Sequence, residues 1–256
     1  FIRWVPLIAV IGFSSLIYGQ MNAPKPVLKL RLLLDRQFGS VAVMALALGM
    51  VMYGSTYVIP QFLAIISDYN AFQTGLVIFW MGIPAFLLMP VLPFMIRRIH
   101  IRIAVGAGML LMAISCFVSI SLTAQSGGAV FTEGQLIRGV GMILSMMFLN
   151  QATVASVAKA DAGDASGIFN AARNLGGSFA LAGLASFQDQ RIWHHSRRME
   201  ESLNANSVSV QNHLDGLARN FGGMDGAMAM LSRTIQREAF VMTYNDVFLA
   251  MGILTL

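Results

Sequence analysis

The 256-residue sequence contains few charged residues and a single cysteine. Only 11% of its residues are Asp, Glu, Lys or Arg, and 56% are hydrophobic, whereas soluble domains have about 25% charged residues. Cys116 lies inside an apolar block and has no second cysteine with which to form an intrachain disulfide. The charges gather in short clusters that leave apolar blocks of about twenty residues or more between them. This pattern argues against a soluble domain and is typical of a protein that crosses a membrane several times.

The sequence also lacks the patterns of an enzyme or a metal site. There is no nucleophile triad or phosphate loop, and His194 and His195 lack a third ligand at helical spacing. The glycine-containing stretches at 138–141 and 176–177 lack the preceding strand that a dinucleotide site needs. The net charge of +5 comes from basic residues between the apolar blocks, where membrane topology requires them. We therefore expect no enzyme activity, no cofactor, no metal and no nucleic-acid partner.

Apolar blocks predict the architecture. Five are long enough to cross a hydrocarbon core of about 30 Å as helices rising about 1.5 Å per residue: 41–66, 75–96, 103–124, 135–158 and 166–187. Two more, 4–19 and 245 onward, are short or cut, and the blocks lack the alternation of a membrane barrel. The prediction is an all-α polytopic transmembrane helix bundle of about seven helices, the first and last incomplete.

Basic residues predict which ends of the helices face the cytoplasm. The connections 20–40 and 97–102 are rich in Lys and Arg, with Asp35 as their one acid, and are therefore expected inside. The connections 67–74 and 125–134 carry only Asp68 and Glu133, which suits the outer side. The long connection 188–243 then falls outside as well, and its six arginines are balanced by six acids.

Hydrophobic residues within this long connection recur at mostly helical spacing, with an interruption at Gly222 and Gly223. The pattern predicts two amphipathic helices that project from the outer face. They could form a solvated hairpin that packs on itself, or a docking surface for a periplasmic partner. The sequence leaves both interpretations open.

Polar residues inside the spans are the candidates for a transport pathway, because they are costly in lipid. Tyr53, Tyr57 and Gln61 follow at i, i+4 and i+8 and share one helix face, which fits a cavity wall or an interfacial belt. Arg138 lies a short way into its span; it either extends to the outer interface or lines the outer half of a pathway. Asn150 can bond between helices or contact a solute.

The stretch ASGIFNAARNLGGSF (165–179) is expected to begin a helix on the cytoplasmic side. Asp161 or Asp164 can cap its start. The polar residues that follow would lie at headgroup level, as an anchor or as a cytoplasmic gate: Asn170, Arg173 and Asn174. Small residues in the spans predict close helix contacts, at Gly139, Gly141, Gly176 and Gly177.

Eighteen methionines, including Met44 and Met146, are many for this length. Methionine is adaptable, so a surface rich in it tolerates ligands of different shapes, although helix packing also uses it.

Several stretches, taken in order, carry a family resemblance. PVLKLRLLLDRQFG (26–39), YVIPQFLAIISDYNAFQTGLVIF (57–79), RGVGMILSMMFLNQATVASV (138–157) and AGDASGIFNAARNLGGSFALA (162–182) resemble the C-terminal half of the EmrB/QacA-type drug:proton antiporters. These are fourteen-helix members of the major facilitator superfamily. The long outer connection, ending in REAFVMTYNDVF (237–248), is similar to that of the EmrB-type branch.

The resemblance implies that the chain is part of a longer protein. Residues 1–40 would be a linker transmembrane helix with a basic cytoplasmic connection, and 41–256 the C-terminal transmembrane bundle with the periplasmic loop 188–243. The implied function is multidrug efflux in exchange for protons across the cell inner membrane, by alternating access. Amphipathic small molecules, protons and membrane lipid would be its partners, with a periplasmic adaptor and an outer-membrane channel as further candidates.

The resemblance also implies where the proton-coupling acids lie. The coupling acids of such antiporters lie in the N-terminal half, and this sequence has no carboxylate in the middle of a complete span. Asp246, at a span edge, is expected to cap or pack the outer end. The alternatives to a multidrug exporter are a narrow-specificity exporter and a transporter-derived scaffold or sensor.

Overall fold

The computed structural model describes residues 11–12, 14–15, 18–19, 29–202, 208–220 and 223–256. All regular structure in these residues is helical, which confirms the all-α prediction. The predicted helix at 4–19 lies mostly outside the described residues. The helices are η1 (Leu30–Leu34), α2 (Arg36–Ile65), α3 (Ala71–Leu88), α4 (Leu92–Arg98), α5 (Ile101–Val118), η2 (Gly128–Val130), α6 (Phe131–Ala155), η3 (Lys159–Asp161), α7 (Ala162–Ser202), α8 (Val208–Asn220) and α9 (Met224–Thr255).

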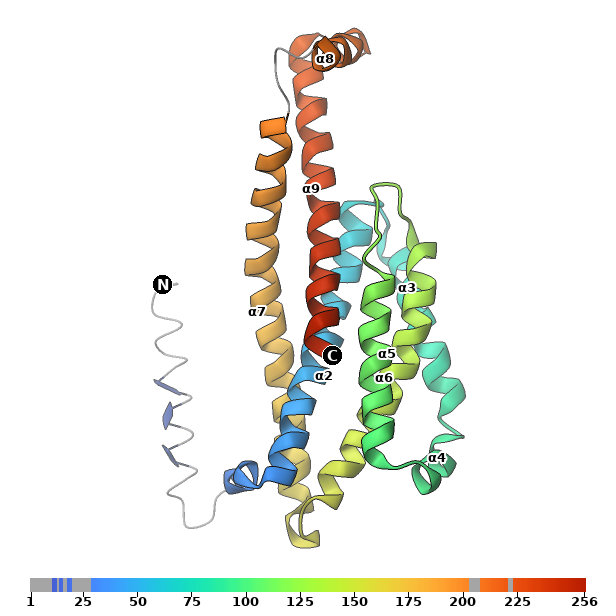
Figure 1. Cartoon of the computed structure of the whole chain (residues 1–256), viewed down its shortest axis with the longest axis vertical. Coiled ribbons are helices and arrows are strands. Elements are labelled where there is room, and N and C mark those ends of the chain that lie inside the picture. Colours follow the sequence, from blue (N-terminus) through green and yellow to red (C-terminus); the bar gives the residue numbers. More distant parts are fainter. Residues whose placement is uncertain (1–10, 13, 16–17, 20–28, 203–207, 221–222) are drawn as a thin grey trace.

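The long helices form a bundle in which α2 and α9 lie between α7 and the α5–α6 pair (Figure 1). Helix α7 packs on α2 and α9, and α3 packs on α6 at the far side. Three helices in the described part of the chain, α2, α3 and α5, are long and apolar enough to cross a membrane. Helices α6, α7 and α9 are longer than α3, but they carry more polar side chains.

The two ends of the bundle hold different connections. At one end, here called the basic end, the Lys29 ammonium group donates to the Asp161 carboxylate. This ion pair raises the pKa of Lys29, because the carboxylate stabilises the protonated amine. It joins two connections that the charge pattern placed on the same side.

At the opposite end, the connections after α2 and α5 are bonded to each other. The Ser67 hydroxyl donates to the Ser126 carbonyl at 2.8 Å, and the Gly128 amide donates to the Tyr69 hydroxyl at 3.0 Å. Arg237 of α9 donates through Nη2 to two carbonyl oxygens, those of Ile66 and Ala124, each at 2.8 Å. One guanidinium group therefore ties α9 to both connections.

The predicted single span at 75–96 is wrong. Helix α3 ends at Leu88, a short turn follows, and α4 begins at Leu92. Pro90 lies in the turn and has no amide hydrogen, so it cannot donate to the carbonyl four residues earlier. The hydrophobic run continues through this turn, so hydropathy alone did not reveal the break between the two helices.

The helices do not end where the long outer connection is predicted to begin and end. Helix α7 continues past residue 187 to Ser202, and α9 begins at Met224 rather than near 245. The two helices rise beyond the rest of the bundle and carry α8 at the tip (Figure 1). We call residues 189–202, 208–220 and 224–236 the arm. Charges end a membrane span, but they do not end a helix, and the Arg197–Glu201 pair supports the extension at i, i+4.

The predicted interruption near Gly222 and Gly223 does occur between α8 and α9. Gly223 has a φ of 104°, a left-handed conformation that side chains disfavour. Gly222 lies outside the described residues.

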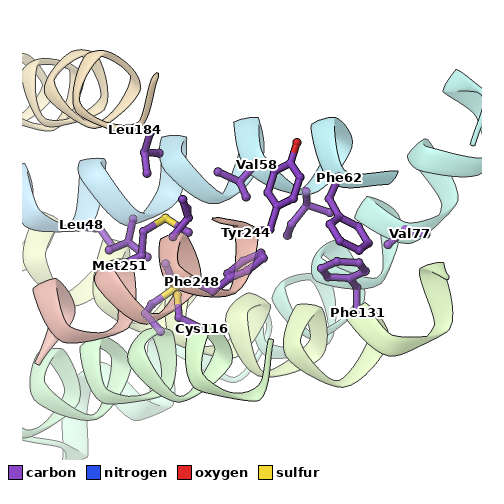
Figure 2. Packing of buried hydrophobic residues seen from close by; sticks show 14 of the residues in the cluster. Leu48, Val58, Phe62, Val77, Cys116, Phe131, Leu184, Tyr244, Phe248 and Met251 are labelled. Atoms are coloured by element: carbon purple, nitrogen blue, oxygen red, sulfur yellow. The ribbon is translucent and has the colours of Figure 1, made fainter. Parts of the chain in front are cut away.

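Aromatic side chains fill the core between α2, α6 and α9 (Figure 2). The Phe62 ring meets the Phe131 and Tyr244 rings edge to face, with centroids 5.4 and 5.2 Å apart, and Phe248 lies beside Phe131. Edge-to-face pairs of this kind contribute about 0.5–1.5 kcal/mol each beyond their buried area. They hold α9 against α2 near the end from which the arm rises.

Candidate functional site

Helices α2 and α7 touch backbone to backbone. A Cβ atom on Gly49 would lie 2.0 Å from the Arg173 carbonyl oxygen, and one on Gly176 would lie 2.1 Å from the Leu46 carbonyl oxygen. Real Cβ atoms do not approach so closely, so only glycine fits at either position. Small residues permit this close approach between membrane helices, where contact replaces the hydrophobic effect as the driving force.

Polar side chains flank this contact. The Tyr53 hydroxyl donates to the Asn174 side-chain oxygen at 3.0 Å, and its ring lies where a side chain on Gly177 would be. Further along, the Gln188 amide donates to the Gln61 side-chain oxygen at 3.0 Å. The structure thus joins two sets of predicted residues, the tyrosine stripe of α2 and the polar stretch of α7.

The three residues of the predicted stripe differ in their contacts with α7. Tyr53 and Gln61 bond to α7, whereas Tyr57 between them is 39% exposed. Asn174 is exposed as well. The α2–α7 pair therefore presents the exposed Tyr57 and the bonded Tyr53–Asn174 pair along one side.

The polar stretch of α7 lies well inside the helix. Because α7 begins at Ala162, Arg173 is roughly 16 Å along the helix at 1.5 Å per residue, well past the first turns. Its Nη1 lies 3.5 Å from the Met146 sulfur of α6, and its Nε is buried without an acceptor in the described residues. Asn170, one turn earlier, is exposed and donates to the Ser166 carbonyl.

Arg138 does not extend to the outer interface. Its side chain is only 2% exposed, within α6 and against α5. A Cβ atom on the neighbouring Gly139 would lie 2.2 Å from the Met81 carbonyl oxygen of α3, and one on Gly141 would lie 2.8 Å from the Gly108 carbonyl oxygen of α5. Close contacts on both sides of α6 thus enclose the guanidinium group.

A cavity of about 890 Å³ opens at the basic end between α2, α5, α6 and α9. The predicted pathway residues, including half-buried Asn150, are absent from its described lining. Its walls are mainly apolar, with Met44, Met109 and Arg102 among them. We regard the α2–α7 face as the better candidate for solute recognition, because polar groups converge there.

Comparison with known proteins identifies the family. The sequence profile of the Major Facilitator Superfamily matches residues 6–181. The chain belongs to this superfamily.

Three curated proteins are similar in sequence to this superfamily member. The chain is 26% identical over 258 residues to Colistin resistance protein EmrB of Acinetobacter baumannii, a match covering 99% of the chain and 50% of that protein. It is 24% identical over 248 residues to Fatty acid resistance protein FarB of Neisseria gonorrhoeae, covering 96% and 48%. It is 23% identical over 248 residues to Multidrug export protein EmrB of Escherichia coli, covering 94% and 48%. The chain spans about half the length of these curated relatives, and the EmrB-type resemblance is confirmed.

One cluster of this superfamily member was not predicted from sequence. Asp246 of α9 accepts from Arg191 Nη2 at 2.7 Å and contacts His195 Nε2 at 2.6 Å, so it links α9 to α7 at the base of the arm. The signal available was the spacing of Arg191 and His195 at i, i+4, but their partner lies more than fifty residues away. No group of three His, Cys, Asp or Glu residues that could hold a metal ion occurs in the described ranges.

Proposed function

We propose that this chain is the C-terminal half of a proton-driven exporter of amphipathic small molecules in the inner membrane. The observation that carries the proposal is the α2–α7 pair, where Tyr53, Tyr57 and Asn174 place polar groups along one side of the two helices. Membership of the superfamily supports it, as do relatives named for colistin resistance, fatty acid resistance and multidrug export.

The proposed mechanism is alternating access, which needs no covalent chemistry. The backbone contacts at Gly49 and Gly176 make α2 and α7 one rigid unit, which can rock as a body around a central site. Tyr57 and Asn174 contact the solute on that unit, and soft methionines adapt to its shape. Protonation then changes the affinity for solute in each state.

The proton-coupling carboxylate of this mechanism is not among the described residues of the spans. Asp246 is paired with Arg191 and His195, and Glu133 is an exposed residue in the first turn of α6. We therefore assign substrate contact to this chain and place proton coupling in the part of the protein that the relatives have and this chain does not span.

The arm is the proposed docking surface for a periplasmic adaptor, which would pass the solute to an outer-membrane channel. The observation in favour is the extension of α7 and α9 well beyond the bundle, with α8 at its tip (Figure 1). The competing interpretation, a hairpin that packs on itself, has support in the packing of α8 on α9. Cross-links from α8 to a second protein would favour docking, and cross-links only to α9 would contradict it.

Export is tested in inverted membrane vesicles that contain the full-length protein. The vesicles are energised, a fluorescent cationic dye is added, and the proton gradient is then collapsed with a protonophore. We expect dye uptake that reverses on collapse and is absent from vesicles without the protein. If several dyes and correctly inserted protein give no gradient-dependent movement, the multidrug proposal fails in favour of a narrow-specificity exporter or a scaffold.

A further inference from the structure

We propose that Arg138 binds the carboxylate of an anionic amphiphile in a small pocket between α2, α3 and α6. The proposal rests on the proposed export function and names a substrate class for it. It begins from an unusual feature of the guanidinium group, which is buried and carries a positive charge that no described carboxylate balances.

The contacts of Arg138 hold it in place without neutralising it. Its Nε donates to the Ser115 hydroxyl at 3.2 Å, and its Nη1 donates to the Gln135 side-chain oxygen at 3.0 Å. Both acceptors are neutral, and the Cys116 thiol is a further neighbour. The Nη2 atom is buried and has no acceptor among the described residues. The ion pairs found in that part of the chain involve other residues. One face of a fixed guanidinium group is therefore left to bind something else.

A pocket opens beside this group. Gln135, Ser55 and Thr56 supply its polar wall, and its apolar wall consists of Ile59, Ile78 and Met81. The Ser55 hydroxyl is buried and, like Arg138 Nη2, has no partner in the described part of the chain. Thr56 is exposed, so the pocket reaches the surface of α2.

The size of the pocket limits how a ligand enters. Its inner volume is about 10 Å³, which is about the space of one water molecule or one oxygen atom. One carboxylate oxygen fits between Arg138 Nη2 and Ser55, while the rest of the headgroup stays at the mouth beside Thr56. An alkyl chain would then lie outside the pocket, against the half-buried Ile78 and Met81 of α3.

Electrostatics select an anion over a water molecule. Burying a charge costs several kcal/mol unless it is paired, and neutral hydrogen bonds offset only part of that cost. A water molecule would satisfy the donor but leave the charge unbalanced. A carboxylate oxygen satisfies the donor and also balances the charge. A cationic amphiphile would be repelled from the same pocket.

The test measures binding rather than transport. The full-length protein is placed in lipid nanodiscs, and equilibrium binding of radiolabelled decanoate is compared with that of decanol and decylamine, after subtraction of binding to empty nanodiscs. The variants are Arg138→Gln, Arg138→Lys and Ser55→Ala. Arg97→Gln is the matched control, because it removes the same charge from an exposed position at the basic end.

We expect Arg138→Gln to weaken decanoate binding by at least about tenfold, because it removes one partner of a buried charge pair. Arg138→Lys should retain part of the affinity, Ser55→Ala should weaken it, and Arg97→Gln should leave it unchanged. Decanol binding should be the same in all of them.

Two results would overturn the proposal: equal decanoate binding by wild type and Arg138→Gln, or equal loss of decanoate and decanol, which would show a structural role. If Arg138→Gln does not fold, Ser55→Ala decides, and unchanged decanoate affinity in that variant contradicts the site. Decanoate binding that depends on Arg138, without gradient-driven transport of either decanoate or dyes, would leave the site standing and reject the export function. Export of dyes without decanoate binding would support the export function and reject the Arg138 site.

Discussion

Replacing Gly176 by alanine should separate α2 from α7. The new Cβ would lie 2.1 Å from the Leu46 carbonyl oxygen and 2.9 Å from its carbonyl carbon. Both atoms are backbone, so no rotamer change relieves the overlap, and the helices must move apart by roughly 1 Å. Overpacking of this kind costs typically about 1–3 kcal/mol, and the same movement stretches the Tyr53–Asn174 hydrogen bond, worth about 1 kcal/mol. We expect a loss of about 2–4 kcal/mol in the free energy of unfolding.

Gly183→Ala is the control in the same helix. Nothing lies within 4 Å of its Cβ position, so this variant should gain up to about 1 kcal/mol from helix propensity. The assay is the free energy of unfolding of each full-length variant in mixed micelles titrated with sodium dodecyl sulfate. If Gly176→Ala and Gly183→Ala agree within about 0.5 kcal/mol, the close contact between α2 and α7 is refuted.

Three further predictions concern the ends of the bundle. Arg237→Gln should leave two carbonyl oxygens unpaired and speed amide hydrogen exchange after α2 and α5, whereas Arg233→Gln, at an exposed position in the same helix, should not. Asp246→Asn should weaken the α7–α9 link by about 1 kcal/mol or more, measured by unfolding; unchanged stability would contradict the link. The raised pKa of Lys29 means that its pairing with Asp161 is fully present below the unfolded pKa and is lost only as pH rises through the folded pKa. The stability difference between wild type and Lys29→Gln should therefore be constant from about pH 7 to pH 9, and a decline within that range would contradict the pairing.

Hydropathy predicted the positions of the long apolar helices. The spans at 41–66 and 103–124 correspond to α2 and α5, because an apolar block of that length has few alternatives to a helix in lipid. Hydropathy did not predict the ends of those helices that continue beyond their apolar block. Helices α7 and α9 continue into the charged arm, and a charge pattern marks an expected membrane boundary but not the end of the hydrogen-bonded backbone.

The candidate site was predictable only as separate pieces. The spacing of Tyr53, Tyr57 and Gln61 indicated one helix face, and the polar residues of α7 stood out in an apolar chain. Their pairing could not be read from the sequence, because Tyr53 and Asn174 are 121 residues apart and their contact depends on how two helices cross. The burial of Arg138 had no local signal either, since snorkelling and burial share the same sequence pattern and differ only in the neighbouring helices.

The central claim is that the α2–α7 face contacts the exported solute. Its most direct test is efflux by the full-length protein in which Tyr53, Tyr57 and Gln61 are all replaced by leucine, with Phe72→Leu at an exposed position of α3 as the control. At matched protein levels, we predict that the triple variant loses gradient-dependent dye movement in inverted vesicles and that the control keeps it. Wild-type efflux by the triple variant would contradict the claim.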